Sequence, residues 1–275
     1  MIETLPLFRP LNEKLILLLS NLEKSDWHKK TVAPEWTVKD IAAHLLDTSL
    51  RTISIHRDKF EAALDDKISS YEDLVNFLNG LNADWVRAFR RMSPELLIEF
   101  LSSTHESFIT CLERLDLHSS SRFSVAWAGE ETSNNWFHIA REYTERWHHQ
   151  QQIREAVNQP GILTKEFYYP VLDTFMQALS HQYKSTIASP GTCVEIKIDS
   201  AAGGVWYLER EIEKWKLQKS PGHDSQVRVL IPVDLSWKLF TKAVSYSEIK
   251  SSISVSGDIR LALPALEMLP VMALR

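Results

Sequence analysis

The sequence predicts a bundle of four long helices followed by a smaller α+β domain. From the start of the chain to about Val157, apolar residues recur at helical spacing with few strand-like alternations. After the stretch "NQPGILT", whose Pro-Gly pair breaks regular structure, short runs alternate at period two. We therefore expect an all-α helical bundle over residues 1–158 and an α+β domain over residues 165–275.

The composition indicates an ordinary globular protein. The chain has 275 residues, of which 44% are hydrophobic, and it contains nine Trp and only eight Gly. This length favours two domains over one. The formal net charge of −5 and the absence of a Lys/Arg block disfavour a nucleic-acid partner, so a small molecule is the expected substrate.

No segment is expected to interact with a membrane. The apolar run "LILLL", which ends at Leu19, is far too short for a transmembrane helix and lacks the flanks and cleavage site of a signal peptide. Cys111 and Cys193 lie far apart without CxxC spacing, which favours buried structural thiols in a reducing compartment. We therefore expect a cytoplasmic protein.

Start and stop signals divide the first half into four helical regions. Thr37, with Asp40 three residues later, predicts a capping box at the start of the second region, "WTVKDIAAHLLDTSLRTISIHRD". Ser93-Pro94 interrupts the third region, because proline disfavours helix in the preceding residue but fits the first helical turn. The other regions extend over about residues 7–22, 71–115 and 131–157.

The second half begins with a predicted helix over about residues 165–183. The runs "CVEIKID", "GVWYLER" and "EKWKLQ" then alternate at period two and are separated by short turns, which predicts antiparallel strands. The remaining elements are a strand at "QVRVLIP", a helix at "VDLSWKLFTKAV", a strand at "SISVSGD" and a final helix at "IRLALPALEML".

The stretch "EYTERWHHQQQIREA" in the fourth helical region carries an unusual set of polar side chains. Glu145 and His149 are four residues apart, so they share one helix face and can point into one volume. His44 lies within the apolar sequence "DIAAHLL", where a histidine is either a satisfied core group or a functional one. Together the three side chains would make a site with three N/O ligands, which is the pattern of a catalytic zinc with an open position.

Several motifs carry a family resemblance. "EWTVKDIAAHL" resembles the second-helix signature of DinB-like metal-binding four-helix bundles, and in particular of the mycothiol-dependent maleylpyruvate isomerase family. "ERWHH" is similar to the Glu-x-x-x-His pair that joins the signature histidine in that family. Related DinB-like proteins have a histidine in place of Glu145. The segments "GGVWYLER" and "SVSGDIRLALPALEML" resemble the sterol-carrier-like domain that follows the bundle in the isomerases.

This resemblance implies that His44, Glu145 and His149 bind a divalent metal, with zinc or nickel favoured by mixed imidazole and carboxylate ligands. It also implies an enzyme that uses a low-molecular-weight thiol, as isomerase or S-transferase, on a small molecule. The alternative is a non-catalytic metal-binding or small-ligand-binding protein of the DinB-like superfamily. A metal-dependent hydrolase is a third possibility, but the sequence singles out no general base for it.

Three further residues are candidates for contacts around the ligands. His148 is three residues from Glu145 and would replace His149 if the helix were rotated. His138 shares the Glu145 face but lies ~10 Å along it at a rise of ~1.5 Å per residue, so it would line a pocket rather than bind the metal. Asp47, one turn beyond His44, would either orient a ligand imidazole or lie solvated on the helix.

Overall fold

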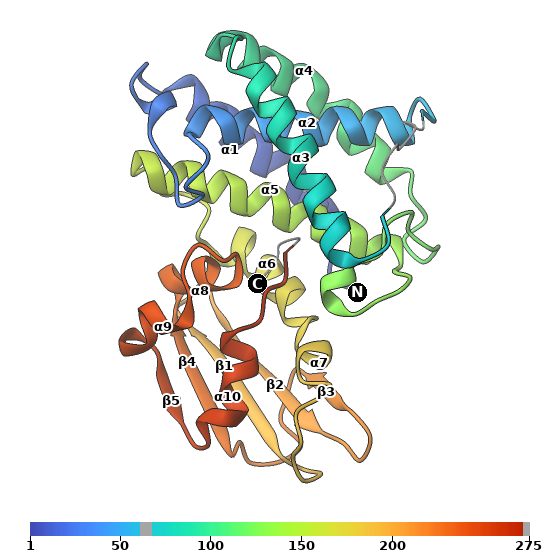
Figure 1. The fold of residues 1–275 in the computed structure, drawn as a ribbon, viewed down its shortest axis with the longest axis vertical. Coiled ribbons are helices and arrows are strands. Elements are labelled where there is room, and N and C mark those ends of the chain that lie inside the picture. Colours follow the sequence, from blue (N-terminus) through green and yellow to red (C-terminus); the bar gives the residue numbers. More distant parts are fainter. Residues whose placement is uncertain (61–67, 272–275) are drawn as a thin grey trace.

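The computed structural model describes residues 1–60 and 68–271. The first half of the chain is helical and the second half forms a five-stranded sheet with helices, which confirms the predicted fold class (Figure 1). The long helices of the first half are α1 (Phe8–Ser20), α2 (Val38–His56), α3 (Tyr71–Phe89), α4 (Pro94–Glu113) and α5 (Asn135–Val157). A short 3-10 turn, η1 (Leu5–Leu7), precedes α1, and two more lie between the helices at η2 (Asp26–His28) and η3 (Ala126–Ala128).

Local signals fix the ends of these helices. At the start of α2, Thr37 Oγ1 accepts a hydrogen bond from the Asp40 N–H, and the Asp40 carboxylate accepts one from the Thr37 N–H. The predicted capping box is therefore confirmed. Ser93 caps α4 and Pro94 is the first residue of that helix. Helix α5 ends at Val157, and its C-cap Asn158 has a φ of 55°, in the left-handed region that ends many helices.

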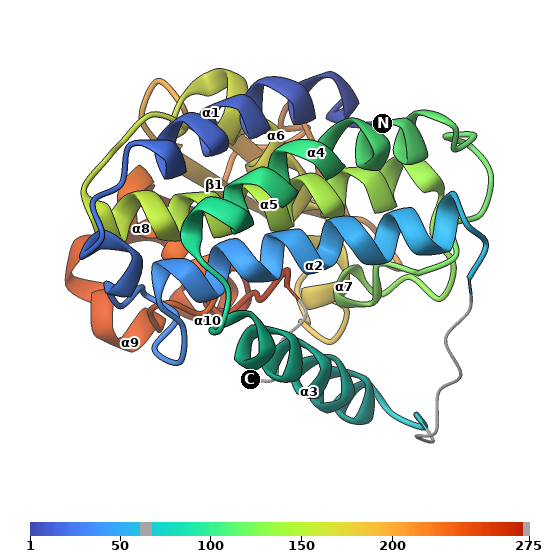
Figure 2. The same cartoon turned by 90° about the horizontal axis from the view of Figure 1, so that it is seen from above.

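The third helical region consists of two helices with different places in the fold. Helices α1, α2, α4 and α5 form the bundle, whereas α3 packs against the outside of α2 (Figure 2). Only three side chains of α3 are buried, namely Val75, Val86 and Phe89. The break at Ser93-Pro94 allows the chain to turn back, so α4 rather than α3 completes the bundle.

The C-terminal domain is built on a sheet of order β3-β2-β1-β4-β5. Strands β1, β2 and β3 pair antiparallel, as the sequence predicts, but β1 and β4 pair in parallel. The predicted helix over residues 165–183 is interrupted, because α6 ends at Met176 and the short α7 follows it. The elements are α6 (Lys165–Met176), α7 (Leu179–Gln182), β1 (Cys193–Asp199), β2 (Gly204–Arg210), β3 (Trp215–Gln218), β4 (Val227–Pro232), α8 (Val233–Phe240), α9 (Tyr246–Ile249), η4 (Lys250–Ser252), β5 (Ser254–Ser256) and α10 (Ile259–Leu266).

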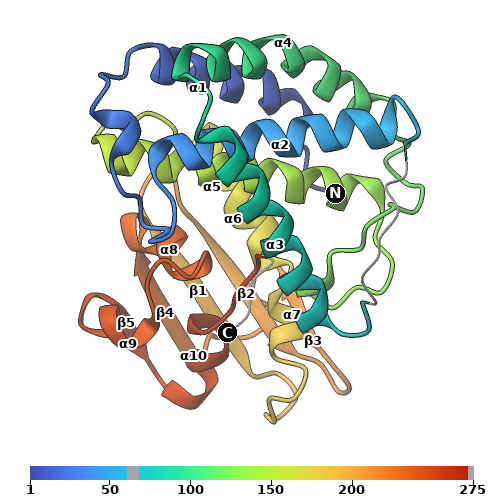
Figure 3. The same cartoon turned by 45° about the horizontal axis from the view of Figure 1, so that its top comes forward.

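Helix α6 joins the two parts by lying between α5 and the sheet (Figure 3). The ring of Trp147 on α5 stacks on Tyr168 of α6, with ring centroids 4.5 Å apart, and both side chains are fully buried. Tyr143 donates its hydroxyl hydrogen bond to the Phe167 carbonyl at 3.0 Å. One apolar core therefore runs from α5 through α6 into the sheet, while a second core lies within the bundle. The boundary between residues 158 and 165 stays a prediction.

Both cysteines are free and buried, as the sequence predicts. Burial raises the pKa of the Cys111 thiol and of the Cys193 thiol, which keeps both protonated at neutral pH. Among the described residues, no helix combines the length and the apolar character that a membrane span requires.

Candidate metal centre

His44 and the pair Glu145 and His149 meet between two helices of the bundle. Helices α2 and α5 run antiparallel, so His44 near the start of α2 lies opposite His149 near the end of α5. The rings of His44 and His149 meet edge to face, with centroids 4.7 Å apart and an interplanar angle of 73°. Glu145 Oε2 lies 3.5 Å from His149 Nε2. The structure thus brings together the three side chains that the sequence analysis proposed as ligands.

The protonation states of His44 and Glu145 are those that a metal requires. Burial, together with the neighbouring His149, holds the pKa of His44 well below its ordinary value, so the ring is neutral at pH 7. Burial alone would raise the pKa of Glu145, but the adjacent His149 and the other nearby imidazoles outweigh it and lower the pKa to about 2. A neutral imidazole and an ionised carboxylate are ready to bind a cation without first releasing a proton.

An unsatisfied polar atom also points to a missing partner. Nδ1 of His44 is buried and makes no hydrogen bond in the described part of the chain, although buried polar atoms almost always have a partner. His44 is only 6% exposed, so solvent does not supply that partner. A divalent cation held by His44, Glu145 and His149 fits this donor set of two nitrogens and one oxygen.

Trp36 forms one wall of the site. Its ring centroid lies 4.9 Å from that of His44 and 6.0 Å from that of His149. The side chain of Thr31 accepts a hydrogen bond from the Ala33 N–H and donates to the Trp36 carbonyl, which fixes the loop before α2. Trp36 was not among the residues predicted from the sequence. Trp36 directly precedes the N-cap Thr37 and therefore lies near the first turns of α2. That position in the sequence was the observation that could have pointed to it.

His148 competes with His44 for the third position. Among the described residues, the ligand atoms that lie within 4.8 Å of one another belong to Glu145, His148 and His149, so these three could hold an ion in place of the set that contains His44. However, Nδ1 of His148 lies 3.3 Å from the Thr144 carbonyl oxygen, which can only accept, and this nitrogen therefore carries a proton. Burial and the neighbouring His149 lower the pKa of His148 to about 3, so the ring is neutral. Only its Nε2 remains as a ligand atom.

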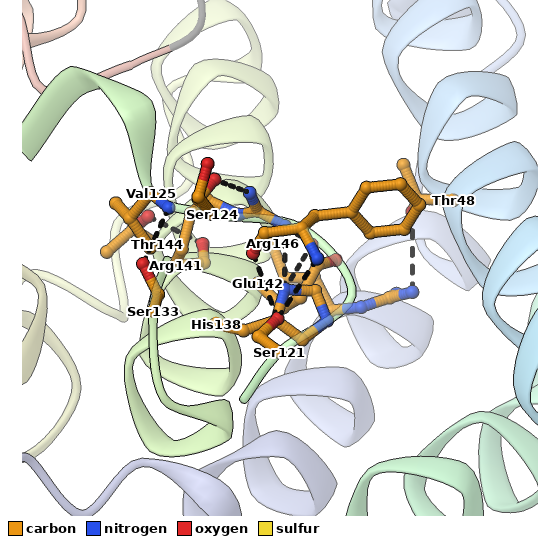
Figure 4. Close-up of polar contacts among 11 residues, drawn as sticks. Thr48, Ser121, Ser124, Val125, Ser133, His138, Arg141, Glu142, Thr144 and Arg146 are labelled. Atoms are coloured by element: carbon orange, nitrogen blue, oxygen red, sulfur yellow. Dashed lines mark hydrogen bonds and ion pairs between the residues drawn. The ribbon is translucent and has the colours of Figure 1, made fainter. Parts of the chain in front are cut away.

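The other two candidates have different partners. The Asp47 carboxylate lies 3.0 Å from Nε of Arg51, so its observed contact is with a guanidinium rather than with a ligand imidazole. His138 belongs to a separate polar network nearer the start of α5 (Figure 4). There, Arg141 donates to Nδ1 of His138 at 2.7 Å and to the Glu142 carboxylate at 3.1 Å.

Hydrogen bonding determines what His138 can do. Because Nδ1 accepts from Arg141, the single proton of the neutral ring is on Nε2, and neither nitrogen offers a free lone pair. Burial lowers the pKa of His138 to about 4, which keeps the ring neutral. The ring of His56, from the end of α2, lies 6.4 Å away. This network therefore joins side chains of α5 beside the end of α2, and its geometry does not offer a second cation site.

A buried arginine lies between the two clusters. Arg146 is 9% exposed, donates to Ser49 Oγ at 2.7 Å, and has its guanidinium carbon 3.8 Å from the centre of the Phe108 ring. Its weaker contact with Thr48 is drawn in Figure 4. Burial lowers the pKa of Arg146 to about 10, so the group stays charged at neutral pH. Arg146 was not predicted from the sequence, since a single arginine in a polar helix carries no special signal.

Comparison with known proteins assigns the bundle to a family. Residues 8–154 match the family described as "Mycothiol maleylpyruvate isomerase N-terminal domain", a match that covers more than half of the chain. This chain belongs to that family. The matched range contains helices α1 to α4 and most of α5, including His44, Glu145 and His149. The family resemblance of the sequence motifs is thereby confirmed.

Solved structures extend the likeness of this family member to its C-terminal domain. A mutant of the mycothiol-dependent maleylpyruvate isomerase aligns with a TM-score of 0.54 and 10% identity, over 92% of this chain and 91% of that one. Another structure of the mycothiol-dependent maleylpyruvate isomerase aligns over the same shares, with a TM-score of 0.51 and 10% identity. At such identity these alignments show a common fold.

A sterol carrier protein domain 2 from Helicoverpa armigera also aligns, with 16% identity and a TM-score of 0.28, over 38% of this chain and 86% of that one. No curated protein matches the sequence.

Proposed function

We propose that this protein is a divalent-metal-dependent enzyme that uses a low-molecular-weight thiol, as isomerase or S-transferase, on a small molecule. The observation that carries the proposal is the convergence of His44, Glu145 and His149 from two bundle helices, in a chain of the mycothiol maleylpyruvate isomerase N-terminal domain family. Zinc or nickel suits two imidazoles and one carboxylate.

The chain's own residues would hold the cation and exclude water from it. His44 and His149 would each supply one nitrogen and Glu145 one carboxylate oxygen, which leaves a position open because three protein ligands do not complete a tetrahedron. Trp36 would shield the ligand rings on one side. When bound, the metal would lower the pKa of a coordinated thiol and hold its thiolate as a nucleophile.

Reversible addition of that thiol accounts for an isomerase. The sulfur would form a bond to one carbon of an activated double bond, a proton would join the other carbon, and the remaining single bond would rotate. Loss of a proton from the second carbon to a base, and departure of the sulfur as the thiolate from the rotated geometry, would then restore the double bond in the other geometry. A reducing compartment such as the cytoplasm would keep the low-molecular-weight thiol in its reduced form. It would do the same for the two buried cysteines.

Thermal shift with defined thiols tests the proposal. Mycothiol, glutathione, bacillithiol and coenzyme A would each be added to the Zn²⁺-loaded protein and to the metal-free protein. We expect the cognate thiol to raise the melting temperature of the loaded form only, because its binding needs the open position. At a thiol concentration of about 100 times Kd, the expected stabilisation is about 2.7 kcal/mol. Affinity should rise with pH until the bound thiol is deprotonated.

A variant of one proposed ligand tests whether the thiol effect depends on the metal centre rather than on binding elsewhere in the protein. Glu145→Gln removes one negative ligand, so it should weaken metal retention while the bundle remains folded. If no thiol stabilises the metal-loaded protein in a way that depends on the metal, the alternative of a non-catalytic metal-binding or ligand-binding protein is favoured.

A further inference from the structure

His149 makes a side-chain hydrogen bond through Nδ1, the ring nitrogen opposite the one that faces Glu145. Nδ1 of His149 lies 2.9 Å from Oε1 of Gln152, one turn further along α5. Both side chains are buried, at 7% and 5% exposure, so water does not compete for this contact. The spacing of three residues places the two side chains on the same helix face.

The chemistry of the amide oxygen decides which nitrogen of the ring carries the proton. An amide oxygen can only accept a hydrogen bond, so Nδ1 of His149 must donate. In the neutral ring the other nitrogen, Nε2, then carries a lone pair. This is the nitrogen that lies 3.5 Å from the Glu145 carboxylate, on the side of the proposed metal.

We propose that Gln152 is a positioning residue of the metal centre, which fixes the tautomer and the ring orientation of His149 so that Nε2 is presented to the cation. This inference rests on the proposed metal centre and adds a residue to it. It also assigns a role to one member of the glutamine run Gln150 to Gln152.

The neighbouring glutamines do not share this role. With its amide oriented so that the nitrogen and the oxygen both have partners, Gln150 hydrogen-bonds to backbone atoms of α1 and to Arg154. Oε1 of Gln151 is buried and makes no hydrogen bond within the described residues. Gln151 is 7% exposed and lies on the same helix, so it offers a control for the loss of a buried amide.

The first test measures Zn²⁺ affinity of the full-length chain by competition with a chelating dye. Residues that orient a metal-binding histidine typically change metal affinity by about 10- to 100-fold when they are lost. We expect Gln152→Leu to weaken Zn²⁺ binding within that range and Gln151→Leu to leave it within about twofold of wild type. Gln152→Glu restores an acceptor of greater strength, so its affinity should equal or exceed that of wild type.

The second test needs no metal. Nitrogen-15 NMR of the metal-free protein reports the tautomer of each histidine, and we expect the Nδ1–H form for His149 in wild type and in Gln151→Leu. Gln152→Leu should shift His149 toward a mixture of tautomers, which a purely structural role of Gln152 would not do.

The outcomes separate this inference from the proposed function. If wild type binds Zn²⁺ and Gln152→Leu binds it equally well with an unchanged His149 tautomer, the role of Gln152 is wrong and the metal centre stands. If wild type binds no divalent metal at all, the metal centre itself is overturned, and the role of Gln152 with it.

Discussion

His44 on α2 and His149 on α5 stand edge to face, with ring centroids 4.7 Å apart, although most of the bundle sequence separates them. Both rings are buried, at 6% and 7% exposure. The bundle thus places these two imidazoles beside the ionised carboxylate of Glu145, an arrangement that favours the binding of a cation.

The first prediction concerns metal content. Elemental analysis should find about one divalent metal per chain in wild type, since one set of three ligands is proposed. The double variant His44→Ala, His149→Ala should contain none, while circular dichroism shows that its helices are retained. His118→Ala serves as the control because that histidine is exposed and lies in the connection between α4 and α5. Unchanged metal content in the double variant would rule out this ligand set.

The second prediction decides between His44 and His148. Nδ1 of His148 is engaged by the Thr144 carbonyl, whereas Nδ1 of His44 has no partner among the described residues. We therefore expect His148→Ala to retain Zn²⁺ with at most a modest loss of affinity, and His44→Ala to lose most of it. The reverse order of affinities would assign the third ligand to His148.

The third prediction concerns the start of α2, which positions His44. Asp40 is 3% exposed, completes the capping box with Thr37 and accepts a hydrogen bond from Arg90 at 3.1 Å. Loss of a helix N-terminal cap costs about 1 kcal/mol, and Asp40→Ala should lower the free energy of unfolding by at least that amount. Asp84→Ala removes an exposed pair with Arg87 and should change it by less than about 0.5 kcal/mol. Urea unfolding of the two variants provides the comparison.

The same carboxylate predicts a pH dependence. Burial alone would raise the pKa of Asp40, but hydrogen bonds from Arg90 and Thr37 outweigh it and hold the pKa below the ordinary value of 3.8. A depressed pKa in the folded state means that the stabilisation is present above pH 3.8 and is lost as the pH falls through the lower, folded value. Between neutral pH and strong acid, wild type should therefore lose more stability than Asp40→Ala. Parallel pH profiles would contradict this.

The fourth prediction concerns the bundle alone. All three proposed ligands lie within residues 1–158, so a fragment of that length should retain Zn²⁺. It should melt below the full chain, because Trp147 loses the stacked Tyr168 and the hydrogen bond that its indole N–H donates to the Ile162 carbonyl. Exposing one large buried side chain costs about 1.5–3 kcal/mol. A folded fragment without metal would show that the C-terminal half supplies a ligand.

The sequence by itself determined the helices and part of the site, because both depend on residues a few positions apart. The capping box of Thr37 and Asp40, the break at Ser93-Pro94 and the shared face of Glu145 and His149 follow from local geometry. His44 became a candidate through its place in the apolar sequence "DIAAHLL", and the family resemblance joined it to Glu145 and His149.

Only the tertiary structure decided how these elements meet. The pairing of α2 with α5 depends on apolar faces that match across a long separation, so no local pattern places His44 at 4.7 Å from His149 or α3 outside the bundle. The same holds for the parallel pairing of β1 with β4. The hydrogen bond from His149 to Gln152 joins residues only three positions apart, but it also depends on the burial of both side chains. Burial removes water as a partner, so the N–H at Nδ1 donates to the amide oxygen of Gln152.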